Sequence, residues 1–153
     1  MSGLELRVVP DVVWLLAAGL MWLVAALTPS LSVPGWLRLV GAVVLIGAGL
    51  GLIVAARVDL ARAHTTFSPK APDRSSDLVT TGVYRFTRNP MYLGMLFALV
   101  ALGTWLSSAY SLAVPVAFVV YIIRLQIRPE ERVLHARFGS EYDDYVHRVR
   151  RWL

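Results

Sequence analysis

Long apolar segments dominate the pattern of hydrophobic and polar positions. Residues 12–27, 36–56, 91–106 and 109–123 contain one charged residue among them, Arg38. A helix that crosses a bilayer needs about 20 mainly apolar residues, with about 17 to 25 allowed. The last two segments are short for this, so we expect their helices to extend into flanking residues around a tight turn at Ser107 and Ser108. The pattern predicts an all-α membrane protein with four transmembrane helices, at about 10–28, 36–57, 90–107 and 109–127.

Two polar segments complete the chain. Residues 58–89 hold no long apolar run and predict a loop. Residues 129–152 predict short C-terminal helices, with Gly139 ending one helix and Ser140 capping the next. We expect residues 1–153 to form a single membrane domain.

The composition narrows the class of protein. The chain has 153 residues, of which 57% are hydrophobic and 16% charged, and its mean hydropathy is +0.61. These values exclude a soluble single-core globule. The absence of cysteine excludes a disulfide scaffold, a thiolate metal site and cysteine nucleophilic catalysis. The three histidines lack the spacing of metal-ligand motifs, so no metal is expected; they are His64, His135 and His147.

The basic residues predict the orientation. The connection 28–35 and the Ser107–Ser108 turn have none, whereas 57–88 has six and 124–153 has seven. The positive-inside bias therefore predicts that both basic segments and both termini lie in the cytoplasm. We expect the membrane to be that of a bacterial or archaeal cell. This bias accounts for the net charge of +5 without a nucleic-acid partner.

Three closely spaced glycines lie at residues 47, 49 and 51 of the second apolar segment. Residues 45–51, L-I-G-A-G-L-G, match the G-x-G-x-G of a nucleotide-binding loop. Such a loop needs a preceding strand and an acidic residue about 20 positions later in a βαβ unit. Here the glycines sit in an apolar run, and Gly47 and Gly51 are four apart, which is typical of helix packing in membranes. The packing could be within the chain or in a homodimer.

Candidate functional residues cluster where the chain is expected to re-enter the membrane and where it is expected to leave it. Pro90 can be the first residue of the third helix, with Arg88 and Asn89 beside the free N–H groups of its N-terminus. Such a terminus suits a carboxylate or another polar ligand group. Glu130 and Glu131 follow the fourth apolar segment, shortly after Arg124 and Arg128. Since a tight turn joins the two predicted spans, these two clusters are expected to be close in space.

The ordered motifs resemble those of integral-membrane methyltransferases, a superfamily that includes isoprenylcysteine carboxyl methyltransferases and phospholipid N-methyltransferases. The resemblance covers about residues 80–150 and rests on G-V-Y-R-F-T-R-N-P-M-Y-L-G at 82–94, R-P-E-E-R-V-L at 128–134 and F-G-S-E-Y-D-D-Y at 138–145. It implies an S-adenosylmethionine pocket on the cytoplasmic side and a tunnel that admits a lipidic or hydrophobic substrate from the bilayer.

The resemblance also assigns roles to particular residues. Positions matching the first part of the cofactor pocket are Gly82, Tyr84, Asn89, Pro90, Tyr92 and Gly94, and Arg88 joins them by its place at the helix N-terminus. Glu130 and Glu131 match the acidic pair of the second part. We expect one of these carboxylates to bind the cofactor's amino group and the other, with Arg128 and Asn89, to orient the acceptor.

Two departures bear on the acceptor. Isoprenylcysteine enzymes usually have histidine before the motif proline, whereas this chain has Asn89, as phospholipid-type members do. An arginine often lies one turn before the acidic pair, whereas Gln126 lies there, so Arg128 or Arg124 must take that role. The identity of the acceptor is therefore left open by the sequence.

Three other classes compete with the methyltransferase interpretation. One is a membrane reductase that uses a nicotinamide cofactor, and the lack of a recognisable nicotinamide site weighs against it. A small four-helix transporter normally has an ionisable residue within a span, and here Arg38 alone interrupts the apolar segments. A non-catalytic membrane scaffold is the third alternative.

Overall fold

The computed structural model describes residues 9–63 and 77–153, and within them the chain forms helices and irregular connections, with no strand. The expectation of an all-α protein is confirmed. The main helices are α1 (Pro10–Leu27), α2 (Gly35–Arg62), α3 (Pro90–Leu106), α4 (Ala113–Ile122), α5 (Arg128–Phe138) and α6 (Ser140–Arg148). Single turns of 3₁₀-helix occur at η2 (Gly82–Arg85) and η3 (Tyr110–Leu112), and a π-helical segment, η4, covers Ile123–Ile127.

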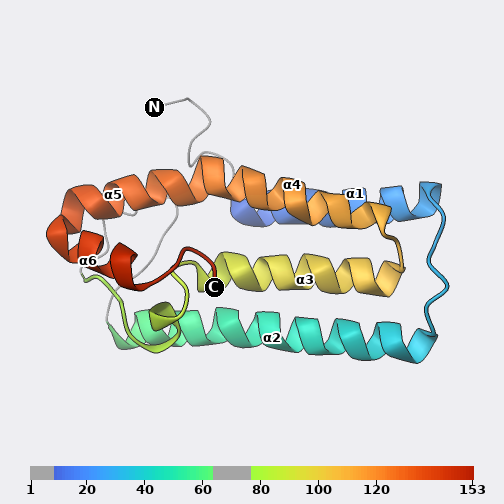
Figure 1. Ribbon diagram of the computed structural model, residues 1–153, viewed down its shortest axis with the longest axis horizontal. Helices are drawn as coiled ribbons and strands as arrows, with labels where there is room; N and C mark the ends of the chain where they lie inside the picture. Colours follow the sequence, from blue (N-terminus) through green and yellow to red (C-terminus); the bar gives the residue numbers. More distant parts are fainter. Residues whose placement is uncertain (1–8, 64–76) are drawn as a thin grey trace.

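Helices α1 to α4 lie side by side as a bundle (Figure 1). One end, here called the uncharged end, carries the α1–α2 connection and the turn after α3, and neither has a charged residue. The opposite end, here called the polar end, carries the end of α2, the start of α3, and α5 and α6. Three helical segments are long and apolar enough to cross a membrane, Pro10–Leu27, Gly35–Arg62 and Tyr110–Phe138, and α3 is a shorter apolar helix.

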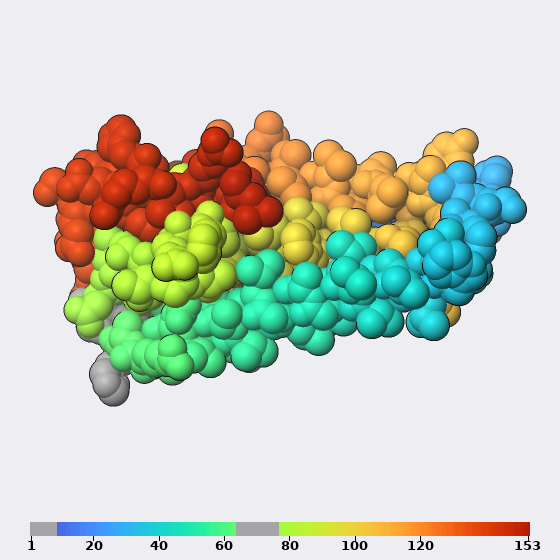
Figure 2. All heavy atoms as spheres, turned by 60° about the horizontal axis from the view of Figure 1, so that its bottom comes forward, coloured from blue at the N-terminus to red at the C-terminus, as the bar shows by residue number. Residues whose placement is uncertain are grey.

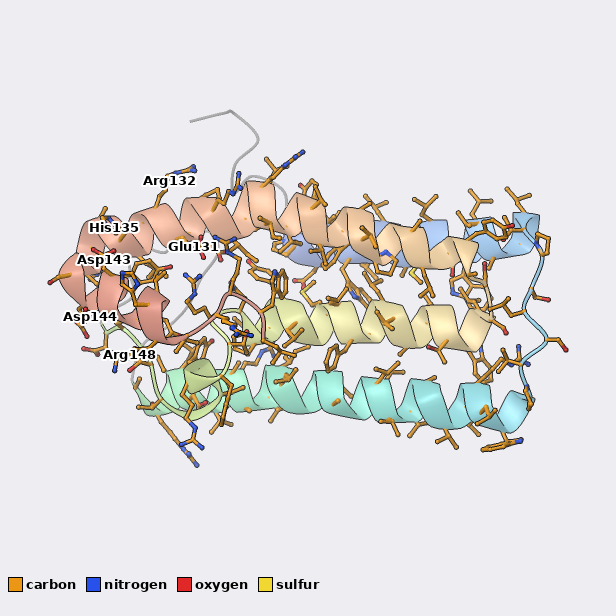
Figure 3. All side chains as sticks on the ribbon, viewed as in Figure 1. Glu131, Arg132, His135, Asp143, Asp144 and Arg148 are labelled. Carbon is orange, nitrogen blue, oxygen red and sulfur yellow. The ribbon has the colours of Figure 1, made fainter. Side chains whose placement is uncertain are left out.

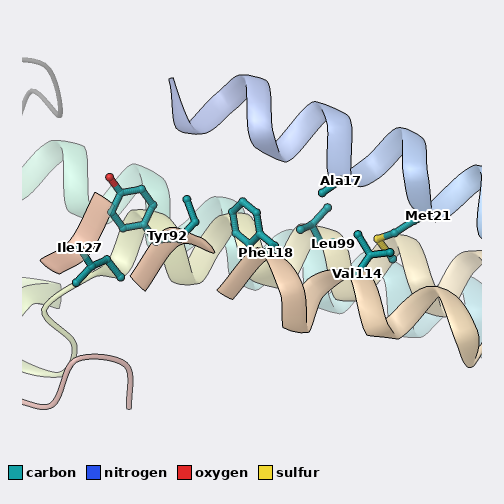
Figure 4. Close-up of a cluster of buried hydrophobic side chains, with 8 residues drawn as sticks. Ala17, Met21, Tyr92, Leu99, Val114, Phe118 and Ile127 are labelled. Atoms are coloured by element: carbon teal, nitrogen blue, oxygen red, sulfur yellow. The ribbon is translucent and has the colours of Figure 1, made fainter. Parts of the chain in front are cut away.

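The core lies between α1, α3 and α4 (Figure 4). Its fully buried members include Met21, Leu99 and Ile122, and Trp14 of α1 donates a hydrogen bond from Nε1 to the backbone oxygen of Met95, 2.9 Å away. Many large apolar side chains point outward instead, such as Leu16 at 68% exposure and Val44 at 63%. So much outward apolar surface suits a bilayer and not water.

Helices α2 and α3 approach each other through glycines. Gly49 and Gly94 face one another so closely that a Cβ on Gly94 would lie 2.6 Å from the backbone oxygen of Gly49. The packing expected of Gly47 and Gly51 is not found among the described residues, because a Cβ at either position would meet nothing within 4 Å. Gly49 lies between Gly47 and Gly51 in the sequence, and it is the glycine on the side of α2 that faces α3.

Three boundaries differ from those expected. Helix α2 continues to Arg62, so the loop expected from residue 58 starts later, and its residues 64–76 lie outside the described residues. The expected end of the fourth span at 127 falls inside a continuous helix, which runs from Tyr110 to Phe138. A π-helical turn lies within this helix just before Pro129, where the Arg128 N–H bonds to the Ile123 oxygen five residues earlier.

The last boundary concerns the turn after α5. Gly139 has φ +52° and ψ −125°, ends α5 and precedes the first residue of α6, Ser140. Ser140 is therefore inside the helix and is not its N-cap, because the glycine alone can adopt the left-handed φ that this sharp turn requires. Helix α6 ends at Arg148 and does not reach residue 152.

Replacing Gly94 by alanine is expected to destabilise the bundle. The added Cβ would meet backbone, which cannot move aside as a flexible side chain can, so we expect a loss of about 1–3 kcal/mol in the free energy of unfolding. Thermal unfolding of the purified protein in detergent measures this loss. Gly47→Ala is the matched control and should leave the midpoint unchanged or slightly raised; equal midpoints for the two variants would refute the contact.

Candidate functional site

A pocket opens at the polar end of the bundle. The cavity itself has a volume of about 60 Å³, and the space outside protein atoms is about 680 Å³ when the open mouth is included. Helices α2, α3, α5 and α6, the turn η2 and residues 77–79 contribute to its wall. Four tyrosines are among the lining residues: Tyr84, Tyr92, Tyr142 and Tyr145.

Glu130 lines this pocket and is 2% exposed. Its Oε1 accepts a hydrogen bond of 2.7 Å from the hydroxyl of Tyr92 at the start of α3. Its Oε2 is buried without a hydrogen-bond partner among the described residues. A buried carboxyl oxygen without a partner is energetically unfavourable. This oxygen is therefore a place where a bound molecule can form a hydrogen bond.

Glu131, the next residue, forms ion pairs with two arginines. Arg151 donates to both of its carboxylate oxygens, from Nε over 3.0 Å and from Nη2 over 2.8 Å. Arg88 approaches the same carboxylate with Nη1, 3.0 Å from Oε1. The side chains of Arg88 and Glu131 are only 10% and 19% exposed, so this pair is screened less than a surface ion pair.

The last residues of the chain lie against the start of α3 (Figure 2). The Arg88 N–H bonds to the oxygen of Arg150, and the Asn89 side chain donates from Nδ2 to the oxygen of Arg151 over 2.9 Å. Thr87 donates its hydroxyl to the same oxygen over 3.3 Å. The amide of Asn89 therefore positions the C-terminal segment. The sequence pattern did not indicate this, because hydrogen bonds to backbone oxygens leave no signature in the residue types of the acceptor segment.

Asp59 of α2 also contributes to the site, although the sequence analysis did not single it out. Its Oδ2 accepts a hydrogen bond of 2.8 Å from the backbone N–H of Val83 in η2. Gly82, with φ +59°, lies directly over this carboxylate, and a Cβ there would clash with it. The requirement for glycine at position 82 thus comes from the turn and from Asp59. Gly82 itself is not among the pocket-lining residues.

Tyrosine contacts connect η2 with α6. Tyr145 donates its hydroxyl to the backbone oxygen of Tyr84 over 2.7 Å, and the Tyr84 hydroxyl is buried without a partner among the described residues. Burial raises the pKa of the Tyr84 phenol above its ordinary value, and the charges of Asp59 and Glu130 raise it further. Burial likewise raises the pKa of Tyr145. Both phenols therefore remain neutral hydrogen-bonding groups at physiological pH.

The structure brings most of the nominated residues to one pocket. Its lining includes Tyr84, Arg88, Asn89, Pro90, Tyr92, Glu130 and Glu131. Gly94 lies at the α2–α3 contact and does not line the pocket. Arg128 lines a neighbouring open groove with Arg132. In the same groove, Nε2 of His135 lies 3.1 Å from Oδ1 of Asp143.

Fold and site together define an integral membrane protein with a partly enclosed, tyrosine-lined pocket beside two adjacent carboxyl groups. The chain belongs to the phospholipid methyltransferase family, whose model matches residues 37–141. The matched segment includes η2, α3 and the acidic pair of α5. The family places the chain among membrane methyltransferases, which confirms the resemblance found in its motifs.

Two relatives are similar to parts of the chain. An uncharacterised protein of Haemophilus influenzae is 40% identical over 63 residues, which are 41% of this chain and the whole of that protein. The nickel-cobalt-cadmium resistance protein NccN of Alcaligenes xylosoxydans is 33% identical over 76 residues, which are 50% of this chain and 35% of NccN. The chain thus spans about a third of the length of NccN. No solved structure matches the chain.

Substituting Asp59 is expected to loosen the pocket wall at η2. Asp59→Ala leaves the Val83 N–H without its acceptor, and we expect a loss of about 1–3 kcal/mol in local or global stability. Hydrogen exchange at Val83 and Tyr84 measures the local part. Asp59→Asn keeps an oxygen acceptor and is the matched control; faster exchange in both variants alike would show that charge, and not this hydrogen bond, holds the turn.

Proposed function

We propose that the protein transfers a methyl group from S-adenosylmethionine to a lipidic or hydrophobic acceptor at the cytoplasmic membrane face. The observation that carries this proposal is Glu130, a buried carboxyl group with one unpartnered oxygen in the pocket of a chain from a methyltransferase family. The site residues come from segments far apart in sequence, and the pocket is where they meet.

The membrane placement proposed here has four spans and both termini in the cytoplasm. The 17 residues of α3 reach about 26 Å at ~1.5 Å per residue, close to the ~30 Å of a hydrocarbon core. At or near the uncharged end, exposed aromatic side chains resemble the belts found at membrane interfaces; they are Trp22, Trp36, Trp105 and Tyr110. The basic residues of the polar end then face the cytoplasm.

Cofactor binding is proposed to depend on Glu130. S-adenosylmethionine supplies a methyl group on a positively charged sulfonium and also carries an amino group, a carboxylate and an adenine. Glu131 is already held by Arg88 and Arg151, so Glu130 is the member of the pair with an oxygen left to accept a hydrogen bond. We assign the cofactor's amino group to Oε2 of Glu130. The unpartnered Tyr84 hydroxyl offers a further polar contact.

Methyl transfer requires mainly that the protein position the methyl donor and the acceptor and exclude water. Helix α6 and the C-terminal segment cover the pocket from one side, through the Tyr145–Tyr84 hydrogen bond and the Arg151–Glu131 pair. A carboxylate or thiolate acceptor has no proton to lose, whereas an amine must lose one to a base. The Arg88–Glu131–Arg151 group, with Asn89, is proposed to orient the acceptor. Arg128, which the sequence suggested for this role, faces the open groove instead.

The position of Glu130 favours a reaction site over a transporter. Among the described residues, the buried ionisable carboxyl of Glu130 lies at the polar end of the bundle, where a cytoplasmic reaction site would lie. A scaffold without catalysis would not need an unpartnered carboxyl oxygen in a pocket.

Purified protein is expected to transfer the radiolabelled methyl group of S-adenosylmethionine into a lipid extract of the host membrane. The label should enter the organic phase only when protein is present, and mass spectrometry should show a product heavier by one methylene. The extract without protein is the control. Absence of labelled lipid across extracts from several membranes would contradict the proposed acceptor class.

Glu130→Gln is expected to weaken cofactor binding by roughly tenfold to a hundredfold, the loss typical of a charged hydrogen bond. Calorimetry with S-adenosylmethionine measures this, and thermal unfolding checks that the variant is folded. Glu141→Gln removes a carboxylate from the exposed face of α6 and should leave affinity unchanged. Undiminished binding by the folded Glu130→Gln protein would overturn the assignment of Oε2.

A further inference from the structure

The outer face of the helix from α4 to α5 changes from apolar to basic along its length. Val116 and Val120 are 64% and 43% exposed. Arg124, Arg128 and Arg132 continue the same four-residue spacing and are all exposed. These five residues are called the valine–arginine face. They lie on one continuous helix, so the change in character occurs within a single surface.

The π-helical turn keeps this face in line. In η4 the Arg128 N–H bonds to the Ile123 oxygen, so the turn contains more residues than an α-helical turn and residues four apart stay nearly above one another. Gln126 and Ile127 of the same segment are buried, which leaves Arg124 and Arg128 outside. The pocket is lined from this helix by Ile127, Glu130, Glu131 and Leu134, so the face lies apart from it.

The positive charges of Arg124 and Arg128 are not neutralised by the acidic pair that follows them. Glu130 is buried against Tyr92, and Glu131 is held by Arg88 and Arg151. No ion pair joins Arg124 or Arg128 to a carboxylate within the part of the chain that the structure describes. Figure 3 shows that Arg132 points away from the bundle at the polar end. The open groove lined by Arg128 also contains Arg88 and Arg151, whose charges are paired with Glu131.

The position along the helix matches a membrane interface. From Tyr110 to Arg128 the helix rises about 27 Å at ~1.5 Å per residue, which approaches the ~30 Å hydrocarbon core of a bilayer. Val116 and Val120 then lie at the depth of lipid tails, while Arg128 lies at the depth of phosphate groups, and Arg124 can extend its long side chain to the same level.

We propose that the valine–arginine face binds an anionic phospholipid, whose phosphate group contacts Arg124 and Arg128 and whose acyl chain lies along Val116 and Val120. Arginine suits this role because its planar guanidinium pairs with phosphate oxygens in two parallel hydrogen bonds. A water-soluble anion would use the arginines but not the exposed valines. The lipid is a bound partner outside the pocket, so this inference is independent of the methyl acceptor and of catalysis.

Native mass spectrometry of the full chain in detergent tests the proposal, with phosphatidylglycerol or phosphatidylcholine added at equal concentration. We expect the wild-type protein to retain phosphatidylglycerol in preference to phosphatidylcholine. In the double variant Arg124→Gln/Arg128→Gln, the ratio of retained phosphatidylglycerol to phosphatidylcholine should fall about tenfold. Arg57→Gln/Arg62→Gln is the matched control, since it removes two exposed arginines from the polar end of α2. It should keep the preference.

Two outcomes would overturn the proposal. One is equal retention of the two lipids by the wild-type protein. The other is an equal loss in both double variants, which would indicate general surface charge. Thermal unfolding verifies that each variant is folded. The charge-conserving variant Arg124→Lys/Arg128→Lys should keep part of the preference, because it keeps the charge and loses only the paired hydrogen bonds.

Discussion

The contact between the backbones of Gly49 and Gly94 determines where the other elements of the bundle can lie. Membrane helices cannot gain stability by expelling water from between them, so close van der Waals contact carries much of their association. With no side chain on either residue, α2 and α3 meet backbone to backbone. This fixes the end of α2 beside the start of α3. Asp59 of α2 consequently reaches η2, which immediately precedes α3.

The two adjacent carboxyl groups show how the same residue type acquires different properties at the polar end. Neighbouring residues on a helix point about 100° apart, so Glu130 and Glu131 face different surroundings. Glu131 joins the start of α3 to the C-terminal segment through Arg88 and Arg151. Glu130 is directed into the pocket, where Tyr92 satisfies one oxygen only. The carboxylate of Glu131 connects two segments of the protein, whereas Oε2 of Glu130 is available to a ligand.

Some features were predictable because they depend on local sequence. The apolar segments and the absence of strand patterns indicated an all-α membrane protein, and the ordered motifs indicated the methyltransferase superfamily. Pro90 was expected to open the third helix, where α3 begins. The same patterns could not assign Asp59, because one aspartate after an apolar segment resembles any solvated charge. Nor could they assign the contacts of residues 150–151, since backbone oxygens accept hydrogen bonds whatever the side chain is.

The sequence by itself determined the helical class, the uncharged and polar ends and the motif residues, because helix length, charge distribution and motif order are properties of the chain as written. Only the tertiary structure decided that Gly49, and neither Gly47 nor Gly51, meets α3, and that Gly94 serves this contact instead of the pocket. It also decided that Glu130 is the carboxyl with a free oxygen. The physical reason is the rotation of each helix about its own axis. That rotation is set by the neighbours against which the helix packs, and it selects which of several equivalent residues faces inward.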